Sequence, residues 1–352
     1  MPFTRIGLKF GLLLLPLVAV QVTELLVLPL DAFTFRFWEA MIIREIYLLP
    51  GPLYPNRRLD KWSAGDQAPR GPRKKFIRLQ SDEFGQRNPP GRKGPYEVVV
   101  IGDSNIVGSN IDEHDTIRAA MERECGCSVY AYGAGLPLNI LSFLSDKRFE
   151  REPPKWVVME FRPGDVEKQN LPIFEPCFQP QYPEGSLASR GCALKLASTS
   201  TERLLQTLQR LGLGEQREIL ELVDRALKQS AYRNLHARLG LVAKDTRIQR
   251  ADPVTADDVA HAVRAFNSYR AVLAARDVRL LLFSMHNGKR GAASVSPWLK
   301  DLREAGFDVI SIDTTTTPPD LFSRWWPDDD SHWREESIRY SAGLIWREIS
   351  RR

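Results

Sequence analysis

The feature that most constrains the fold is the apolar run 98–101, Val-Val-Val-Ile, which ends at Gly102-Asp103-Ser104. Four β-branched residues in succession are typical of a strand buried on both faces, as in a parallel sheet. Glycine permits a tight turn, and Asp and Ser favour the start of a helix. A serine in this place would lie at the edge where open α/β sheets bind ligands, with backbone N–H groups beside it. The same residues also fit an ordinary strand-turn-helix in which Ser104 only caps the helix.

Further apolar runs alternate with helical patterns along the chain. Strands are predicted at 129–132, 156–161, 278–285 and 309–312, and helices at 116–124, 138–149, 255–275 and 335–350. The helix that follows Thr255 has an N-cap pattern, with Asp258 three residues further on. This alternation predicts an α/β fold in which crossover helices connect the strands of a parallel sheet.

The N-terminus differs in character from the rest of the chain. Arg5 and Lys9 precede an apolar stretch that runs to residue 30 and is interrupted by Glu24. About 20 such residues can cross a bilayer, and basic residues before them favour a cytoplasmic N-terminus with the remainder exported. We therefore expect an uncleaved, single-pass anchor; a cleaved signal peptide and a buried core helix are the alternatives.

The predicted organisation has three parts. Residues 1–30 form the anchor, residues 31–95 a connector, and residues 96–352 a catalytic domain with a helical insertion at about 194–250. The connector holds five basic residues between positions 70 and 78, which we interpret as a solvated linker. The net charge of +5 is spread along the 352 residues and does not predict nucleic-acid binding.

The chain has four cysteines, which could form disulfides or bind a metal. Cys125 and Cys127 are close in sequence, so we do not expect them to bridge each other, and two cysteines make a poor zinc site. Cys177 and Cys192 flank a loop rich in Pro and Gly, and export would permit a disulfide between them. No metal or cofactor is predicted.

A second group of candidate catalytic residues precedes the last predicted helix, in the sequence Asp328-Asp329-Asp330-Ser331-His332-Trp333. A serine nucleophile needs a base, and histidine fits that role near neutral pH. An acid two or three residues before the histidine can orient its ring. A solvated acidic turn and a calcium-type oxygen site are the alternatives. His114, His236, His261 and His286 are less suited, because they stand in loops or on helices without an obvious partner.

Together these motifs resemble the SGNH (GDSL-type) hydrolases, and more narrowly the alginate O-acetyltransferase-like branch. Residues 102–104 match the nucleophile block, Gly133-Ala134-Gly135 the second block, and residues 330–333 the Asp-x-His-Trp signature of that branch. The resemblance covers about residues 80–350. It implies an SGNH, flavodoxin-like three-layer sandwich around a central parallel sheet, preceded here by the transmembrane helix.

The resemblance also implies roles for individual residues. Ser104 would be the nucleophile, His332 the base and Asp330 the orienting acid. Asp329 remains an alternative, because ordinary SGNH members place the acid three residues before the histidine. The third block departs from the wider family, since Gly164 stands where an oxyanion-binding asparagine would be.

In place of that asparagine, Glu160-Phe161-Arg162 resembles the Glu/Arg pattern of the acetyltransferase-like branch. Arg162 is therefore expected to serve the oxyanion, together with the backbone N–H groups of Ser104 and Gly135. A salt bridge to a neighbouring acid is the alternative role for Arg162, and Gly133 is the alternative donor to Gly135.

Three functions follow from this likeness. The first is acetyl transfer to an exported bacterial polysaccharide through an acyl-serine, supplied by a membrane-bound O-acyltransferase partner. The second is an esterase that uses water as acceptor, and the third is a non-catalytic polysaccharide-binding component. The expected location is the bacterial inner membrane, with the catalytic domain in the periplasm.

Overall fold

The structure is a computed structural model. It describes residues 15, 16, 19, 53, 56–63, 75–133, 140, 143, 144, 146–166, 171, 173, 174, 254–285, 298–312, 317 and 332–352. The chain divides into two compact units, Met1–Ile46 with Lys195–Arg250, and Tyr47–Leu194 with Ala251–Arg352. Every helix and strand discussed below belongs to the second unit.

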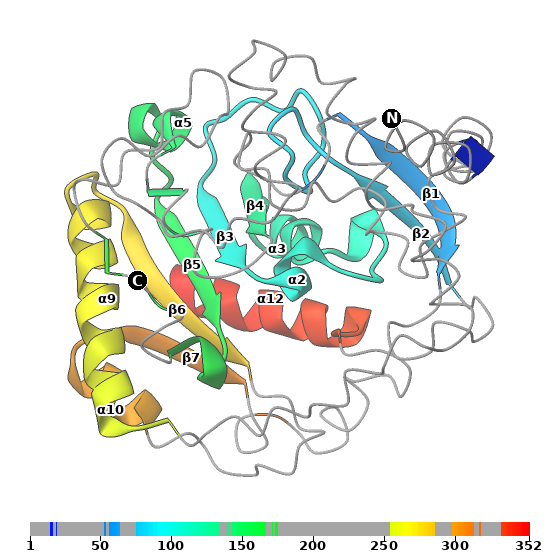
Figure 1. Cartoon of the computed structure of the whole chain (residues 1–352). Coiled ribbons are helices and arrows are strands. Elements are labelled where there is room, and N and C mark those ends of the chain that lie inside the picture. Colours follow the sequence, from blue (N-terminus) through cyan, green and yellow to red (C-terminus); the bar gives the residue numbers. More distant parts are fainter. Residues whose placement is uncertain are drawn as a thin grey trace, which may run out of the picture. The chain divides into compact units, whose positions relative to one another are not determined.

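A five-stranded parallel sheet forms the centre of this unit (Figure 1). Its strands are β3 (Val98–Gly102), β4 (Val129–Gly133), β5 (Trp156–Phe161), β6 (Arg279–Met285) and β7 (Asp308–Ile312). The spatial order is β4-β3-β5-β6-β7, so the first strand of the sheet lies between the second and the third. The chain therefore reverses its direction of winding beside β3, and such a point is where α/β sheets bind ligands.

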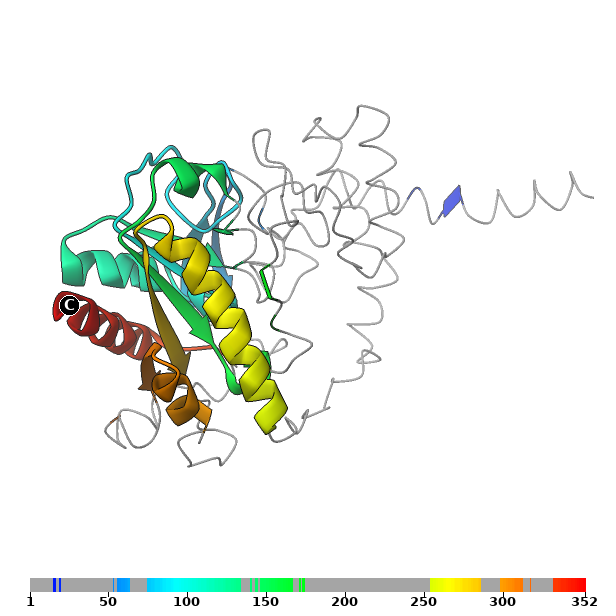
Figure 2. The same ribbon diagram turned by 90° about the vertical axis from the view of Figure 1, so that its left-hand side faces the viewer.

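Helices cover both faces of the sheet, as Figure 2 shows. The helices α9 (Ala256–Ala274) and α10 (Trp298–Glu304) share one apolar core with the sheet, and α3 (Ile117–Cys125) and α12 (Glu335–Ser350) share the other. Alternate residues of one strand enter opposite cores, because successive side chains of a strand point to opposite faces. In β3, Val99 belongs to the core shared with α9 and α10, while Val100 belongs to the core shared with α3 and α12.

The predicted α/β fold with a parallel sheet is confirmed. The strand at 156–161 and the helix at 335–350 have the predicted bounds, and the other predicted strands agree to within one residue at each end. The predicted N-cap of α9 is also confirmed. The hydroxyl of Thr255 accepts from the N–H of Asp258, and the carboxylate of Asp258 accepts from the N–H of Thr255.

Part of the predicted connector forms a β-hairpin instead of a solvated linker. Strands β1 (Arg58–Ser63) and β2 (Lys75–Gln80) pair in antiparallel fashion, with Leu59 opposite Leu79. In β2 the buried Ile77 and Leu79 alternate with the exposed Phe76 and Arg78, so one face of the strand contributes apolar side chains to the interior. This period-2 pattern was hidden in the sequence by the density of Arg and Lys.

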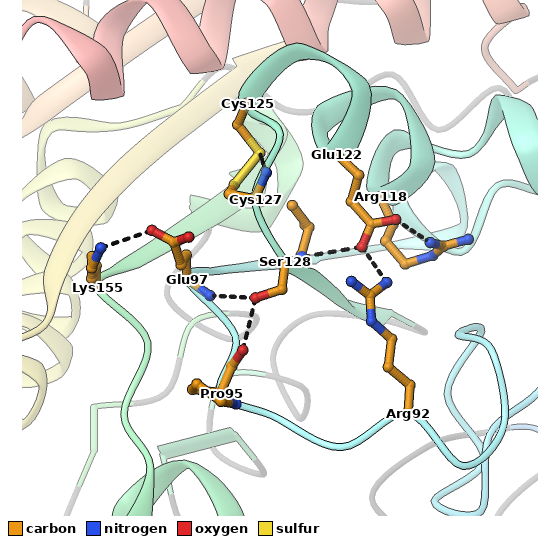
Figure 3. The surroundings of a disulfide bond; sticks show 10 residues. Arg92, Pro95, Glu97, Arg118, Glu122, Cys125, Cys127, Ser128 and Lys155 are labelled. Carbon is orange, nitrogen blue, oxygen red and sulfur yellow. Dashed lines mark hydrogen bonds and ion pairs between the residues drawn. A yellow bond between two sulfur atoms is a disulfide. The ribbon is translucent and has the colours of Figure 1, made fainter.

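The expectation for Cys125 and Cys127 is wrong, because the two form a disulfide (Figure 3). Cys125 ends α3, and the chain bends at Gly126 in the left-handed conformation, which brings the two Cα atoms to 5.0 Å. That separation lies within the range that disulfides require. Figure 3 shows the bridge beside Ser128, at the start of β4. Cys177 and Cys192 lie outside the described residues, so their pairing stays a prediction.

Most of the predicted anchor lies outside the described residues. Within the part of the chain that the structure describes, no helix combines the length and the apolar character needed to cross a bilayer. Of the run 11–30, only Leu15, Pro16 and Ala19 are described.

Candidate active site

The candidate nucleophile Ser104 lies at the carboxyl end of β3, as the first residue of the short helix α2 (Ser104–Val107). Asp103 caps this helix, and its Oδ1 accepts from the N–H of Asn105 at 2.7 Å. Gly102 is required by close packing, because a Cβ at this position would overlap Glu160 and Ile106. Among the described residues, no hydrogen bond engages the backbone N–H of Ser104, which is therefore available to an oxyanion.

The structure brings the predicted nucleophile and the predicted base together. His332 Nε2 lies 3.0 Å from Ser104 Oγ, although the two residues are 228 positions apart in the sequence. This is hydrogen-bond distance, at which a neutral imidazole can accept the hydroxyl proton. Ser104 is half-buried and His332 is 7 % exposed, so the pair is largely shielded from water.

Three other predicted site residues cannot be placed. Asp329 and Asp330, the two candidates for the orienting acid, lie outside the described residues, as does Gly135. The choice between the two acids therefore stays a prediction.

The structure favours Gly135 over Gly133 as the backbone donor to the oxyanion. The N–H of Gly133 donates to Gln86 Oε1 at 2.9 Å, so this N–H already has a partner. A Cβ at Gly133 would also stand 2.6 Å from Val107 Cγ2, which explains why glycine is needed there. Its role is close packing between β4 and α2, and Gly135 is left as the predicted oxyanion donor.

A cluster of charged side chains lies beside the nucleophile turn. Glu160, on β5, is fully buried, and its Oε2 accepts from the N–H of Asp103 at 2.9 Å. Arg162 follows β5 directly, and its Nη1 lies 3.0 Å from Asp103 Oδ2. The backbone N–H of Arg162 donates to Asp165 Oδ2 at 2.7 Å. The ends of β3 and β5 are thus joined by polar contacts as well as by the strand ladder.

Arg162 makes the ion pairs that the sequence offered as the alternative to an oxyanion role. Burial opposes the charge of its guanidinium, but Asp103 and Asp165 outweigh burial and raise the pKa of Arg162. Half of the side chain (52 %) is exposed, so the group stays reachable from solvent while it is held by two carboxylates. Its service to an oxyanion stays a prediction.

Glu160 is a functional candidate to which the sequence reasoning gave no role of its own. Complete burial raises its pKa well above the ordinary value, the charge of Asp103 adds to this, and Arg162 opposes it. Oε1 has no hydrogen-bond partner among the described residues. Burial and the neighbouring carboxylate of Asp103 thus favour the protonated form of Glu160. An acid inside the otherwise apolar run 156–161 was the signal in the sequence, because unpaired acids are rarely fully buried.

The variant Glu160→Gln is expected to become increasingly more stable than the wild type as the pH rises. A carboxyl whose pKa is higher in the folded than in the unfolded state binds more protons when folded, so its contribution to the free energy of unfolding falls with pH. The loss begins near pH 4.3 and reaches at most about 1.4 kcal/mol per pH unit. Denaturant unfolding between pH 5 and 8 should show an advantage of the glutamine variant that grows with pH. A variant that is less stable than the wild type at pH 8 would mean that Glu160 is ionised.

The buried side chain of Arg87 binds the backbone that follows the nucleophile turn. Arg87 is 2 % exposed and donates to the carbonyls of Val107 at 2.9 Å and Ile111 at 2.6 Å, and also to that of Gly108. Its Nε pairs with Glu113 Oε2 at 3.2 Å. Complete burial lowers the pKa of Arg87, and the charge of Glu113 opposes this shift. No local pattern in the sequence marked Arg87, because its partners, which include the carbonyl of Arg78, are distant in the sequence.

The other histidines that are described have ordinary roles. His114 is exposed and its ring contacts Asp112 and Asp115, in agreement with a surface loop residue. His261 is buried on α9, and its Nε2 lies 2.7 Å from the carbonyl oxygen of Leu171. The described residues include no group of three or more His, Cys, Asp or Glu that could hold a metal ion.

Two cavities that described residues line lie away from the Ser-His pair. One, of about 550 Å³, lies between β2 and α3, and the other, of about 530 Å³, lies at the amino ends of β5, β6 and β7. Neither is lined by Ser104 or His332. Because the pair sits at the opposite, carboxyl ends of the strands, we base the function on the pair and not on these cavities.

No protein-family model matches the chain, and no curated protein matches it.

Proposed function

We propose that the chain is an O-acetyltransferase of an exported bacterial polysaccharide that works through an acyl-serine at Ser104. The observation that carries the proposal is the 3.0 Å contact between Ser104 Oγ and His332 Nε2. It occurs at the carboxyl edge of a parallel sheet, next to the strand where the winding reverses. The order β4-β3-β5-β6-β7, with helices on both faces, also fits the flavodoxin-like, SGNH-type sandwich that the sequence motifs resemble.

In the first half of the reaction, His332 takes the proton of Ser104 as Oγ attacks the acetyl carbonyl carbon of the donor ester. The carbonyl oxygen gains a negative charge, which the N–H of Ser104 and, by our prediction, Gly135 and Arg162 would stabilise. His332 then gives its proton to the leaving oxygen, and the acetyl group stays on Ser104.

In the second half, His332 takes the proton of a sugar hydroxyl while that oxygen attacks the acetyl-serine. Collapse of the intermediate breaks the bond to Oγ, and Ser104 recovers its proton from His332. The product is a sugar acetate, and with water as acceptor the same steps release acetate. We assign the orienting role at His332 to Asp330, with Asp329 as the alternative.

The remaining parts of the proposal concern the cellular setting. The apolar run after Arg5 and Lys9 would hold the chain in the inner membrane, with the catalytic domain in the periplasm. The acetyl donor would be supplied there by a membrane-bound O-acyltransferase.

The proposal is tested by trapping the intermediate. The full-length protein, incubated with an activated acetyl ester and quenched in acid, should gain the mass of one acetyl group on Ser104. Ser109→Ala is the matched control, because Ser109 is buried just after α2 and its hydroxyl has no described partner; this variant should be labelled like the wild type.

Whether Ser104 is labelled, and how fast the label is then lost, distinguishes the three functions. Discharge that is faster with polysaccharide fragments than with buffer alone supports transfer. Discharge that is unaffected by the fragments supports the esterase. A protein that is never labelled on Ser104 is a binding component, and the proposal then fails.

A further inference from the structure

We propose that Asn105 is a positioning residue that sets the geometry of the Ser104–His332 pair by clamping the two segments together. The inference rests on the proposed function, since it concerns how the same pair is aligned. Its basis is one contact: Oδ1 of Asn105 accepts from the backbone N–H of Trp333 at 3.2 Å.

This hydrogen bond can position the pair because each of its two partners is the sequence neighbour of a member of the pair. Asn105 follows Ser104 directly, and Trp333 follows His332 directly. Because a peptide unit is planar, the N–H of Trp333 lies in one plane with the carbonyl and Cα of His332. Fixing that N–H therefore fixes the backbone from which the imidazole projects. The clamp joins the two chain segments one residue beyond each member of the pair.

Both ends of the clamp are held independently. The backbone N–H of Asn105 donates to Asp103 Oδ1 at 2.7 Å, which fixes it to the nucleophile turn. The ring of Trp333 packs edge-on against Phe283 of β6, with centroids 6.0 Å apart, and α12 begins two residues later at Glu335. The bond thus connects two segments that each have a further contact of their own.

Burial makes this contact worth more than an exposed hydrogen bond. Asn105 is 6 % exposed and Trp333 is 3 % exposed, so water has little access to either partner. Without the amide oxygen, the N–H of Trp333 would be left unpaired in an apolar surrounding, which favours a shift of the segment that carries His332. A displacement of about 1 Å in a reacting group can cost roughly 100-fold in rate.

The test compares kcat and KM for hydrolysis of an activated acetyl ester by full-length variants. Asn105→Leu removes the acceptor with little change of volume, and should lower kcat about 100-fold while KM stays within about 3-fold. Asn105→Ser, which is too short to reach Trp333, should show the same loss if the leucine variant does not fold. Asn105→Asp keeps an acceptor oxygen and should recover most of kcat.

The matched control is Thr116→Val. Thr116 is a buried N-cap whose hydroxyl accepts from the N–H of Ala119, and its loss removes a side-chain to backbone bond of the same kind away from the pair. This variant should be destabilised yet keep the wild-type kcat when assayed below its melting temperature.

Equal kcat in Asn105→Ser and Thr116→Val would overturn the positioning role, and so would a loss that appears in KM alone. Ser104→Ala, measured in the same assay, separates this failure from a failure of the proposed function. If Ser104→Ala is inactive and the Asn105 variants are not impaired, only the clamp is refuted.

Discussion

Changing Ser104 to alanine is expected to reduce turnover of an activated acetyl ester by a factor on the order of 10⁴–10⁶ while the protein stays folded. The substitution removes one oxygen from a half-buried side chain, so its effect on stability should be small. His332→Ala should cost about as much, because residues that act as a unit lose activity together. Steady-state kinetics give the first quantity, and thermal unfolding gives the second.

Two further results make the interpretation specific. The double variant Ser104→Ala/His332→Ala should be no worse than either single variant, since the two side chains share one proton transfer. Ser109→Ala should retain full turnover, because its buried hydroxyl does not contact the pair. Full activity in Ser104→Ala would refute both the transferase and the esterase.

The same assay decides between the two acids that the structure does not describe. Asp330→Asn should lower turnover by about 10²–10⁴-fold through misorientation of the imidazole, while Asp329→Asn should be nearly silent. The reverse result would place the orienting acid three residues before His332, as in ordinary SGNH members.

The elements that the sequence predicted well are those whose signals are local. Residues 156–161 form a strand within their predicted bounds because a short run that is apolar except for Glu160 fits a strand buried on both faces. The start of α9 was predictable because Thr255 and Asp258 satisfy each other's backbone N–H within one turn. The pairing of Ser104 with His332 was expected from the resemblance of residues 102–104 and 330–333 to the SGNH motifs, and the two side chains lie 3.0 Å apart.

The features that escaped prediction depend on tertiary contacts. The hairpin β1–β2 was hidden because the run of basic residues up to Arg78 obscures the buried positions Ile77 and Leu79. The disulfide of Cys125 was excluded on spacing alone, but the pairing depends on the bend at Gly126 where α3 ends. Gln86, Arg87 and Asn105 carry no local signal, since each bonds to backbone atoms that are distant in the sequence.

The second large effect is expected on stability, from Arg87→Met. The guanidinium of Arg87 is buried and bonds to four backbone carbonyls, besides its ion pair with Glu113; the carbonyls belong to Arg78, Val107, Gly108 and Ile111. Methionine fills a similar length of the site but leaves the four carbonyls without this donor and Glu113 without this partner. Removing one partner of a buried ion pair costs about 3–5 kcal/mol. Denaturant unfolding should show a loss of that size in the free energy of unfolding.

Arg92→Met is the matched control for this loss. Arg92 also pairs with a carboxylate, that of Glu122, but its side chain is 31 % exposed and solvent can replace the contact. Such pairs are worth about 0–1 kcal/mol, so this variant should stay close to the wild type. Arg87→Lys should recover only part of the loss, because one ammonium cannot reproduce a planar set of donors directed at four carbonyls. The contrary result is that Arg87→Met lowers the free energy of unfolding no more than Arg92→Met does. That result would mean that the buried guanidinium does not hold residues 107–111, which follow the nucleophile turn.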